Sequence, residues 1–363
     1  MFASCDRKTT LFVGVDVHRD THTAVGLSPF GEKLFEMTVG NYEEDFRTLT
    51  AKVDEVSEKA MLSPYYGLED CQSYGERLAF HLVSEGARVV SVPPILVDER
   101  RVRETHPEKS DSLDALGVAR VMIQRIDMLP LFTVTEESRK AKQIKELSHD
   151  RDFLVSERTR LKNQLHTLLH RLWNSAYRLK FKDPFSKKAL RYWSHAAPGG
   201  SDPFVVRSMR RKVKRLSAIR AEVDEIDDEL LRLIEESGHT LTTANGIGTT
   251  IAAEIIGEVG DVNRFHSPAA LAKYAGCAPR ECSSGKTTRH RKTRSGNRRL
   301  NRAFHRMALS QISISGNKKA REYFQRKVSE GKSKAQALVC LRRQLVNIVW
   351  MMMKHRTEFQ LLA

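Results

Sequence analysis

The stretch Leu11-Phe-Val-Gly-Val-Asp-Val17 decides the fold of the N-terminal part of the chain. It is a compact apolar run, long enough for a buried strand and too short for a helix. Residues 23–27 and 33–39, joined by the turn Ser28-Pro-Phe-Gly31, predict a hairpin that continues the same sheet. Asp16 therefore places a carboxylate at the end of a strand that we expect to be central in the sheet.

Helices and strands then alternate. The patterns predict a helix over Tyr42–Val56, a short strand over Lys59–Leu62, a loop over Pro64–Gly67, a helix over Tyr74–Ser84 and a strand over Ala87–Val92. Glu69 follows the predicted loop. Three strands followed by alternating helix and strand is the order of an RNase H-like domain, so we expect an α/β fold in the first 130 residues.

A second acidic element is Lys109-Ser-Asp-Ser-Leu-Asp-Ala-Leu116. The apolar residues that follow recur at helical spacing, so Asp111 and Asp114, three positions apart, share one face of the predicted helix. Aspartate is also common in the first turn of an ordinary helix, where the helix dipole stabilises it. The spacing alone is therefore compatible with a metal site or with a simple helix start.

Asp16, Glu69, Asp111 and Asp114 lie on separate elements that an RNase H-like sheet would bring together. Like charges raise one another's pKa, so four carboxylates do not cluster without a counter-charge. Mg²⁺ prefers carboxylate oxygen, and two such ions can activate a nucleophile and stabilise a leaving oxygen at a phosphodiester. We therefore expect a Mg²⁺ (or Mn²⁺) site; the alternative is four unrelated surface or capping acids.

The chain of 363 residues carries 61 Lys and Arg against 45 Asp and Glu, a formal net charge of +16. This surplus predicts a polyanionic partner, nucleic acid first and an anionic membrane second. Neither a long apolar run nor a signal-peptide pattern is found, so we expect a cytoplasmic, nucleoid-associated protein with no membrane partner. The five cysteines form no Cys-x-x-Cys pair, which indicates reduced thiols rather than disulfides or structural zinc.

We divide the chain into residues 1–130, 131–238 and 239–363. In the middle part, two leucine- and isoleucine-rich seams predict two long helices of coiled-coil type, paired with each other or across subunits. Phe181–Phe204 between them is rich in Pro and Gly, which predicts an irregular connector. The connector and the start of the second helix are basic, and we expect contact with phosphate. The cations are Lys187, Lys188, Arg207, Arg210, Arg211, Lys212, Lys214 and Arg215.

The C-terminal part opens with Asn245-Gly-Ile-Gly-Thr249, which resembles the hairpin of a helix-hairpin-helix motif. Gly246 and Gly248 allow close backbone approach, and amides at the following helix start can meet a phosphate, although any helix corner can use such a turn. A dense cationic stretch lies further on, and we expect its first half to be a loop that a polyanion orders. The residues that we expect to contact nucleic acid are Lys286, Arg289, Arg291, Lys292, Arg294, Arg298, Arg299 and Arg302.

Taken in order, these motifs resemble the insertion-sequence 110 family, the DEDD-type transposases. Gly14-Val-Asp-Val-His18 resembles the family's first RuvC-like motif, Glu69 with Tyr74 its Glu-x-Thr-Gly-x-Tyr segment, and Lys109–Ala115 its Lys-Thr-Asp-x-x-Asp-Ala motif. The C-terminal motifs are Gly246-Ile-Gly248, Tyr274-Ala-Gly-Cys-Ala-Pro279, Ser284-Gly285 and Ser295-Gly-Asn-Arg-Arg-Leu300. Two positions depart from the family pattern: Cys71-Gln72 replaces Thr-Gly, and Ser283 stands where Gln often precedes the serine.

The resemblance implies a RuvC-like DEDD domain, a coiled-coil middle and a mainly helical C-terminal domain. It implies that the four acids bind metal and that Ser284 is a nucleophile forming a covalent serine–DNA linkage. It also implies donor and target DNA and a structured guide (bridge) RNA as partners. Acids from one subunit and a serine from another would require a homodimer or a homotetramer.

Alternatives remain at this stage. Ser283 competes for the nucleophilic role, and the place before Gly285 favours Ser284. A RuvC-like structure-specific DNA endonuclease would need the acids but not the serine, because water would attack the phosphate. A non-catalytic nucleic-acid-binding protein would keep the acids for structural reasons. The ordered series of acids followed by Ser284-Gly285 favours the transposase.

Overall fold

The computed structural model describes residues 5–71, 73–101, 110–284, 287–291 and 296–359, with the backbone alone described for 98–101, 280–284 and 287–291. The chain forms two compact units, Met1–Ser138 with Asn263–His266, and Arg139–Val262 with Ser267–Ala363. The division into 1–130, 131–238 and 239–363 remains a prediction. Each unit is described by itself.

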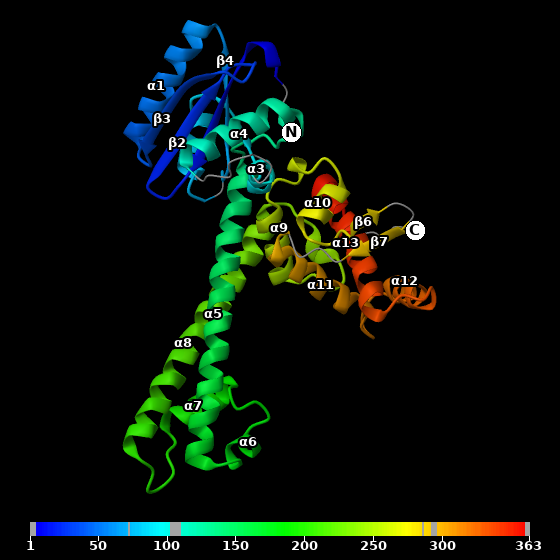
Figure 1. Cartoon of the computed structure of the whole chain (residues 1–363). Helices are drawn as coiled ribbons and strands as arrows, with labels where there is room; N and C mark the ends of the chain where they lie inside the picture. Colours follow the sequence, from blue (N-terminus) through cyan, green and yellow to red (C-terminus); the bar gives the residue numbers. More distant parts are fainter. Residues whose placement is uncertain (1–4, 72, 102–109, 285–286, 292–295, 360–363) are drawn as a thin grey trace. The chain divides into compact units, whose positions relative to one another are not determined.

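The first unit is built on a five-stranded sheet with the order β3-β2-β1-β4-β5 (Figure 1). Its strands are β1 (Thr10–Val17), β2 (Thr21–Leu27), β3 (Lys33–Gly40), β4 (Ser63–Leu68) and β5 (Arg88–Ser91). The first three pair antiparallel as a meander, whereas β4 and β5 run parallel to β1. The predicted α/β character, the hairpin after the first strand and the central place of that strand are confirmed.

The connection from the first helix to the fourth strand differs from the prediction. Helix α1 (Glu43–Ala60) continues through Lys59 and ends at Met61, whose left-handed φ of 54° closes the helix. The strand predicted over Lys59–Leu62 is therefore wrong, and the segment Pro64–Gly67, predicted as a loop, lies within β4. Tyr65 and Tyr66 are buried on opposite faces of the sheet, so tertiary burial overrides the local turn signal from Pro and Gly.

Helices cover both faces of the sheet (Figure 1). The odd-numbered residues of β1, from Leu11 to Val17, pack with α1 and α2 (Glu76–Ser84). On the other face, Phe12 of β1 lies in a core with α4 (Asp111–Arg125) and α3 (Pro94–Arg101). A strand buried on both faces has no solvated side, which explains why Leu11–Val17 is a continuous apolar run rather than an alternating one.

Two glycines let α4 lie directly on the sheet. A Cβ atom at Gly14 of β1 would lie 2.3 Å from the amide nitrogen of Ala119 and 2.4 Å from the carbonyl oxygen of Ala115. A Cβ atom at Gly67 of β4 would lie 2.3 Å from the sulfur of Met122. The helix that begins with Asp111 is therefore seated against β1 and β4 by the missing side chains of these glycines.

Replacing Gly14 by alanine is expected to destabilise the protein by about 1–3 kcal/mol, because the clashing atoms belong to the α4 backbone and not to a flexible side chain. The measurement is the urea midpoint followed by circular dichroism. Gly199→Ala is the matched control, since a Cβ atom there meets nothing within 4 Å. An unfolding midpoint of Gly14→Ala equal to that of the control would contradict this account of the packing.

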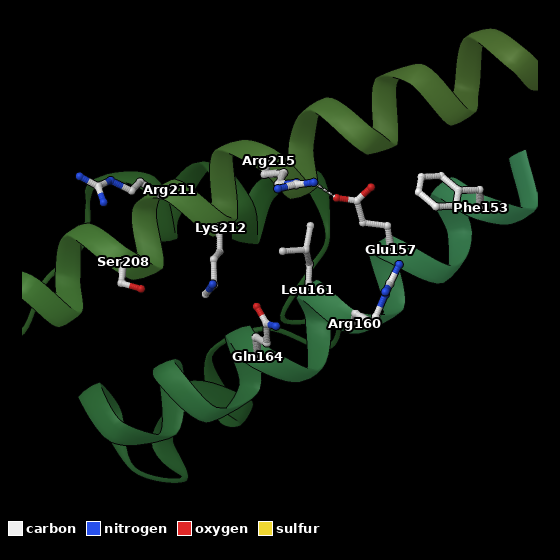
Figure 2. A pocket seen from close by; sticks show the side chains of 9 residues that line it. All are labelled: Phe153, Glu157, Arg160, Leu161, Gln164, Ser208, Arg211, Lys212 and Arg215. Carbon is white, nitrogen blue, oxygen red and sulfur yellow. Dashed lines mark ion pairs between the residues drawn. The ribbon is translucent and has the colours of Figure 1, made fainter. Parts of the chain in front are cut away.

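Two long helices of the second unit, α5 (Glu136–Trp173) and α8 (Pro203–Glu236), pair with each other within one chain. The first three residues of α5 are counted with the first unit. Leu154, Leu161 and Leu165 of α5 share an apolar core with Val213 and Leu216 of α8. The sequence had left pairing within the chain or across subunits open, and this seam is satisfied within the chain. Figure 2 shows the polar side of the same pair of helices.

The connector between these helices is more ordered than predicted. Between α5 and α8 lie α6 (Ala176–Lys180) and α7 (Lys187–His195). Helix α7 falls within Phe181–Phe204, so the prediction of an irregular connector is wrong for Lys187–His195. No proline or glycine occurs between Pro184 and Pro198, which leaves room for α7. Trp193 of α7 is fully buried and its indole nitrogen donates to the carbonyl oxygen of Pro184 at 2.9 Å, which fixes the connector to the helix pair.

The remainder of the second unit is mainly helical. Its elements are α9 (Thr249–Val259), α10 (Pro268–Tyr274), the strands β6 (Arg280–Ser284) and β7 (Thr287–Arg291), α11 (Arg298–Ile312), α12 (Lys318–Ser329) and α13 (Lys334–His355). Helix α9 is buried from Ala252 to Val259 and packs on α8 and α11, whereas α13 packs on α10, α11 and α12. Within the described parts of the chain, none of the helices has the length and apolar character that crossing a membrane requires.

Candidate active site

Asp16 is a buried carboxylate at the carboxyl end of β1. Its residue is only 4% exposed, and it shares the α4 face of the sheet with Phe12 and Gly14 because alternate residues of a strand point the same way. Burial of a carboxylate costs free energy unless charge or hydrogen bonds compensate it. The strand therefore holds Asp16 in a place that an ordinary surface aspartate would not occupy.

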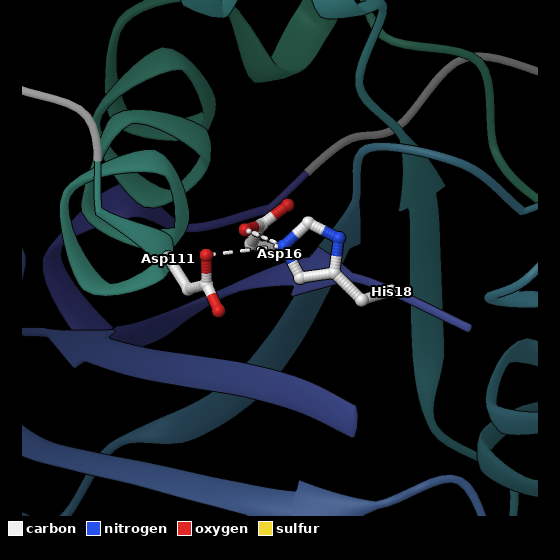
Figure 3. Close-up of side chains that lie close together, drawn as sticks. All are labelled: Asp16, His18 and Asp111. Atoms are coloured by element: carbon white, nitrogen blue, oxygen red, sulfur yellow. Dashed lines mark ion pairs between the residues drawn. The ribbon is translucent and has the colours of Figure 1, made fainter. Parts of the chain in front are cut away.

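Asp111 approaches Asp16 from the first turn of α4 (Figure 3). The helix starts there because Ser110 caps it, its hydroxyl accepting the amide of Leu113 at 3.3 Å. Asp111 stands one and two turns before Ala115 and Ala119, the residues that contact Gly14, so it projects toward the same strand. The imidazole Nε2 of His18 lies 3.1 Å from Oδ2 of Asp16 and 3.1 Å from Oδ1 of Asp111.

Among the described residues, Asp16, His18 and Asp111 form a group whose ligand atoms all lie within 4.8 Å of one another. The side chain of Asp16 is 6% exposed, whereas those of His18 and Asp111 are 45% and 52% exposed. The cluster is therefore anchored on its buried side and open to solvent on the other. A phosphate group can reach the open side without any rearrangement of the sheet.

Glu69 and Asp114 lie at the same edge of the sheet but outside that compact group. The amide of Glu69 donates to the carbonyl oxygen of Val15 at 3.3 Å, which extends the parallel register of β4 and sets Glu69 beside Asp16. Asp114 is 8% exposed and lies one turn along α4 from Asp111. The structure thus places all four predicted acids in one unit and brings Asp16 and Asp111 together, while a common metal site for all four remains a prediction.

His18 is the residue that the sequence analysis did not assign to the site. It was quoted only as the last residue of Gly14-Val-Asp-Val-His18, although an Asp-x-His spacing at a strand end puts both side chains on one face. That spacing was the available signal. A turn in which the amide of His18 donates to the carbonyl oxygen of Thr21 at 3.0 Å fixes its position.

The donor set fits a divalent cation. Two carboxylate oxygens from different elements lie around one point, and Mg²⁺ and Mn²⁺ are bound in proteins chiefly by such oxygens. The imidazole nitrogen of His18 is a metal ligand that Mn²⁺ binds more readily than Mg²⁺ does. A buried Asp16 beside a second carboxylate also favours a positive charge nearby, which a bound cation would supply.

Ser284 is the last residue of β6, where it pairs in register with Thr287 of β7. Ser283 pairs with Thr288. The side chains of both serines lie outside the described residues, as do Lys286, Lys292, Arg294 and the side chains of Arg289 and Arg291. The stretch predicted as a loop is in part a strand, since β7 takes Thr287–Arg291 into a two-stranded ladder.

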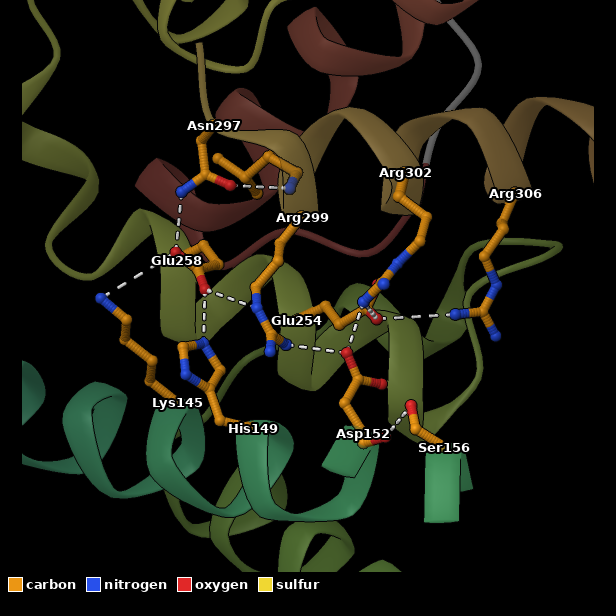
Figure 4. A network of polar contacts seen from close by, with 11 residues as sticks. Lys145, His149, Asp152, Ser156, Glu254, Glu258, Asn297, Arg299, Arg302 and Arg306 are labelled. Carbon is orange, nitrogen blue, oxygen red and sulfur yellow. Dashed lines mark hydrogen bonds and ion pairs between the residues drawn. The ribbon is translucent and has the colours of Figure 1, made fainter. Parts of the chain in front are cut away.

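Arg298, Arg299 and Arg302 are predicted nucleic-acid contacts on α11, and two of them are already engaged inside the protein (Figure 4). Nη1 of Arg299 and Nη2 of Arg302 lie 2.8 and 2.5 Å from the same carboxylate oxygen, Oδ2 of Asp152 on α5. Arg302 also reaches Glu254 of α9 at 2.8 Å, a residue with a fully buried side chain. A phosphate would have to compete with these carboxylates for Arg299 and Arg302. Arg298 is exposed and has no ion pair among the described residues.

Glu258 holds the start of α11 in the same network (Figure 4). Its carboxylate accepts from His149 and from the side-chain amide of Asn297, both at 2.7 Å, while Asn297 caps α11 by accepting the amide of Leu300 at 3.0 Å. Burial favours a raised pKa for Glu258, but the hydrogen bonds from His149 and Asn297 outweigh it and the pKa is lowered. The start of α11 is thereby fixed to α5 and α9.

Gly246 and Gly248 have different surroundings. Gly246 has a left-handed φ of 83°, and a Cβ atom there would lie 2.7 Å from Cβ of Ser310 on α11. Gly248 is the exposed N-cap of α9, and a Cβ atom there would meet nothing within 4 Å. The first glycine is therefore required for packing, and the second leaves the amide end of α9 accessible. Contact of either with nucleic acid remains a prediction.

Family models and known proteins match this chain over most of its length. Residues 13–174 match the family model of a DEDD-type transposase, and residues 238–325 match the transposase family IS116/IS110/IS902. The chain is 24% identical to the insertion element IS116 44.8 kDa protein of Streptomyces clavuligerus, over 97% of each chain. It is 25% identical to the IS110 43.6 kDa protein of Streptomyces coelicolor, over 96% of this chain and 95% of that protein. The pilin gene-inverting protein of Moraxella bovis is 22% identical, over 96% and 97% of the two chains.

The chain has a mixed α/β unit with carboxylates at one sheet edge and a mostly helical unit, and two transposase family models match it. Together these features define a DNA transposase. The residues matched by the first model include all four predicted acids, and those matched by the second include Ser284. The chain belongs to the insertion-sequence 110 family of transposases. Its substrate is therefore DNA, and a DEDD-type domain implies use of a divalent metal.

Proposed function

We propose that this transposase cuts and rejoins the DNA of a mobile element through a serine–DNA covalent intermediate, with Asp16, Glu69, Asp111 and Asp114 as the metal-binding acids and Ser284 as the nucleophile. The observation that carries the proposal is the convergence of Asp16 and Asp111, from a strand and a helix far apart in the sequence, on a single His18 nitrogen. The strand order β3-β2-β1-β4-β5 supports an RNase H-like, RuvC-like fold for this unit.

The acids and the cation have separate tasks. A divalent cation bound by the four acids would supply positive charge to the scissile phosphate and lower the pKa of the attacking group. Asp16 supplies a rigid, buried anchor, and Asp111 an exposed carboxylate on the side open to substrate. His18 lies within hydrogen-bond distance of both, and it can orient them or carry a proton between them and solvent.

The covalent step requires no nucleotide cofactor, because each phosphodiester bond that breaks is replaced by another. Oγ of Ser284 attacks the phosphorus, the new Oγ–P bond replaces the bond to one DNA oxygen, and the serine proton ends on that departing oxygen. Attack by a hydroxyl of another DNA strand on the serine phosphodiester reverses the chemistry and reseals the backbone. The number of phosphodiester bonds is unchanged, so exchange of strands needs no external energy source.

The partners follow from this reaction. Donor and target DNA are its substrates, and a structured guide RNA that pairs with both would select the sites. The formal charge of +16 supports binding of several nucleic-acid strands at once. The serine and the acids belong to different units of the chain, so a homodimer or a homotetramer can complete one site with residues of two subunits.

The test is recombination of a plasmid that carries the gene's own flanking DNA, with the purified protein and RNA transcribed from those flanks. With Mg²⁺ or Mn²⁺ we expect joined products and a protein–DNA adduct on denaturing gels, and with EDTA neither, while circular dichroism stays unchanged. Sequencing of RNA that co-purifies with the protein should return the flanking DNA. Cleavage that persists in EDTA contradicts the metal site, and metal-dependent cleavage without any adduct favours a RuvC-like endonuclease.

A further inference from the structure

A basic groove separate from the acid cluster lies between α5 and α8 (Figure 2). It encloses a cavity of about 540 Å³. The groove is lined by Phe153, Glu157, Arg160, Leu161 and Gln164 of α5, and by Ser208, Arg211, Lys212 and Arg215 of α8. Each set recurs every three or four residues, so each is a single stripe along its helix, and the two stripes face one space.

The groove has a surplus of positive charge. Its lining contains four cations and a single acid, Glu157, which pairs with Arg215. In the part of the chain that the structure describes, Arg160, Arg211 and Lys212 have no ion pair, and Arg160 and Arg211 are exposed. Three cations around one cavity repel one another and favour a bound anion.

Helix stability does not explain these charges. Helix α8 is basic in its first half, from Arg207 to Arg220, and carries no acid before Glu222. The helix dipole acts within the first turn, Pro203–Val206, which carries no cation, so it does not account for them. From Arg207 to Arg215, no acid three or four residues away on α8 is present to pair with them. A concentration of cations that its own helix does not neutralise favours an anionic partner.

The groove also offers an aromatic surface and neutral hydrogen-bonding groups. Phe153 is 63% exposed and lies at one end of the groove, while Ser208 and Arg211 lie toward the other (Figure 2). The side-chain amide of Gln164 and the hydroxyl of Ser208 can each donate and accept. Leu161, which is buried between the two helices, forms the bottom of the groove.

We propose that this groove binds an unpaired segment of nucleic acid, with its phosphates on Arg160, Arg211 and Lys212 and a base stacked on Phe153. Cationic grooves with an exposed aromatic ring bind single strands, because an unpaired base presents a face for stacking and a base inside a duplex does not. An acidic peptide would use the cations but not the ring. The proposal rests on the transposase's use of nucleic acid, but it does not depend on the acid cluster or on Ser284.

The test uses the full-length protein and fluorescence anisotropy with labelled single strands of about 15 nucleotides and the matching duplex. Arg211→Gln/Lys212→Gln is expected to weaken single-strand binding about 10- to 100-fold and to reduce the salt dependence by about 0.7 per lost phosphate contact. Arg171→Gln/Arg232→Gln, which removes two exposed charges of the same two helices outside the groove, is the control and is expected to weaken binding less than about 3-fold.

Phe153→Ala tests the stacked base. It is expected to weaken single-strand binding about 10-fold and to leave duplex binding unchanged, since only the unpaired base uses the ring. RNA and DNA strands of the same sequence are compared, and stronger binding of RNA would assign the segment to a guide RNA through Gln164 or Ser208 and the 2′-hydroxyl.

Equal weakening by the groove pair and the control pair would overturn the site, because it would indicate a diffuse charge effect. The groove would not be a nucleic-acid site if Phe153→Ala bound single strands as tightly as the wild type and polyglutamate displaced the labelled strand as well as an unlabelled strand does. Asp16→Asn separates this proposal from the catalytic one, since it is expected to bind the strands normally while losing cleavage. Weak binding by Asp16→Asn would contradict the independence of the groove.

Discussion

Asp16→Asn is expected to lower DNA strand cleavage by about 100-fold or more while the protein remains folded. The substitution keeps the size of the side chain but removes the charge of the one acid that is almost wholly buried in the cluster. It also removes repulsion between Asp16 and Asp111, so the thermal midpoint is expected to stay equal or to rise. We therefore expect loss of activity without loss of stability. Replacing an aspartate that has only a structural role would instead lower the stability of the protein.

The assay compares initial rates of plasmid cleavage at saturating Mg²⁺ and Mn²⁺. Asp20→Asn is the matched control, because Asp20 is an exposed aspartate four residues further on, in the turn after β1. We expect it to cleave at the wild-type rate. If Asp16→Asn were folded and cleaved as fast as Asp20→Asn, the buried carboxylate would have no part in the reaction.

Ser284→Ala is expected to remove the covalent protein–DNA species and to lower recombination by more than about 1,000-fold, because no other group can form the serine–phosphate bond. Binding of DNA is expected to persist, since a hydroxyl contributes little to contact with a polyanion. The measurement is adduct formation on denaturing gels, together with recombination in the same reaction.

Ser283→Ala is the control that the chain itself provides. Ser283 is the neighbouring serine that competes with Ser284 for the nucleophilic role, and its replacement leaves the proposed nucleophile in place. We expect Ser283→Ala to retain the adduct. If Ser283→Ala lost the adduct and Ser284→Ala kept it, Ser283 would be the nucleophile instead of Ser284. Cleavage retained in both, but still lost in Asp16→Asn, would indicate attack by water.

Three of the acids could be placed by sequence reasoning because each has a local signal. Asp16 ends an apolar run, and Asp111 and Asp114 share a helical face, so their elements could be placed from period and length alone. His18 had only the weak signal of a strand-end spacing. The position of β4 was predicted wrongly because Pro64 and Gly67 are turn residues by preference, while packing between β1 and β5 makes them part of a strand.

The arginines of α11 could not be interpreted from their neighbours in the sequence. Around Arg299 and Arg302 the chain has almost no acids, which favoured a nucleic-acid contact. Their carboxylate partners come from Asp152 and Glu254, which lie about 150 and 50 residues earlier in the chain. The charges of Arg299 and Arg302 look unbalanced along the chain but are balanced in space. Arg160, Arg211 and Lys212, by contrast, have no ion pair within the described part of the chain.

The sequence by itself determined the elements: a buried strand ending in Asp16, a capped helix beginning at Asp111, two long helices with apolar seams and a strong surplus of cations. These follow from short-range periodicity and backbone preference, which the chain carries locally. Only the tertiary structure decided which side chains meet, because contacts such as Asp16 with His18 and Asp111, or Arg302 with Asp152 and Glu254, depend on packing between distant segments. Gly14 and Gly67 show the physical reason. Helix α4 can pack closely on β1 and β4 only because these two residues have no Cβ atom.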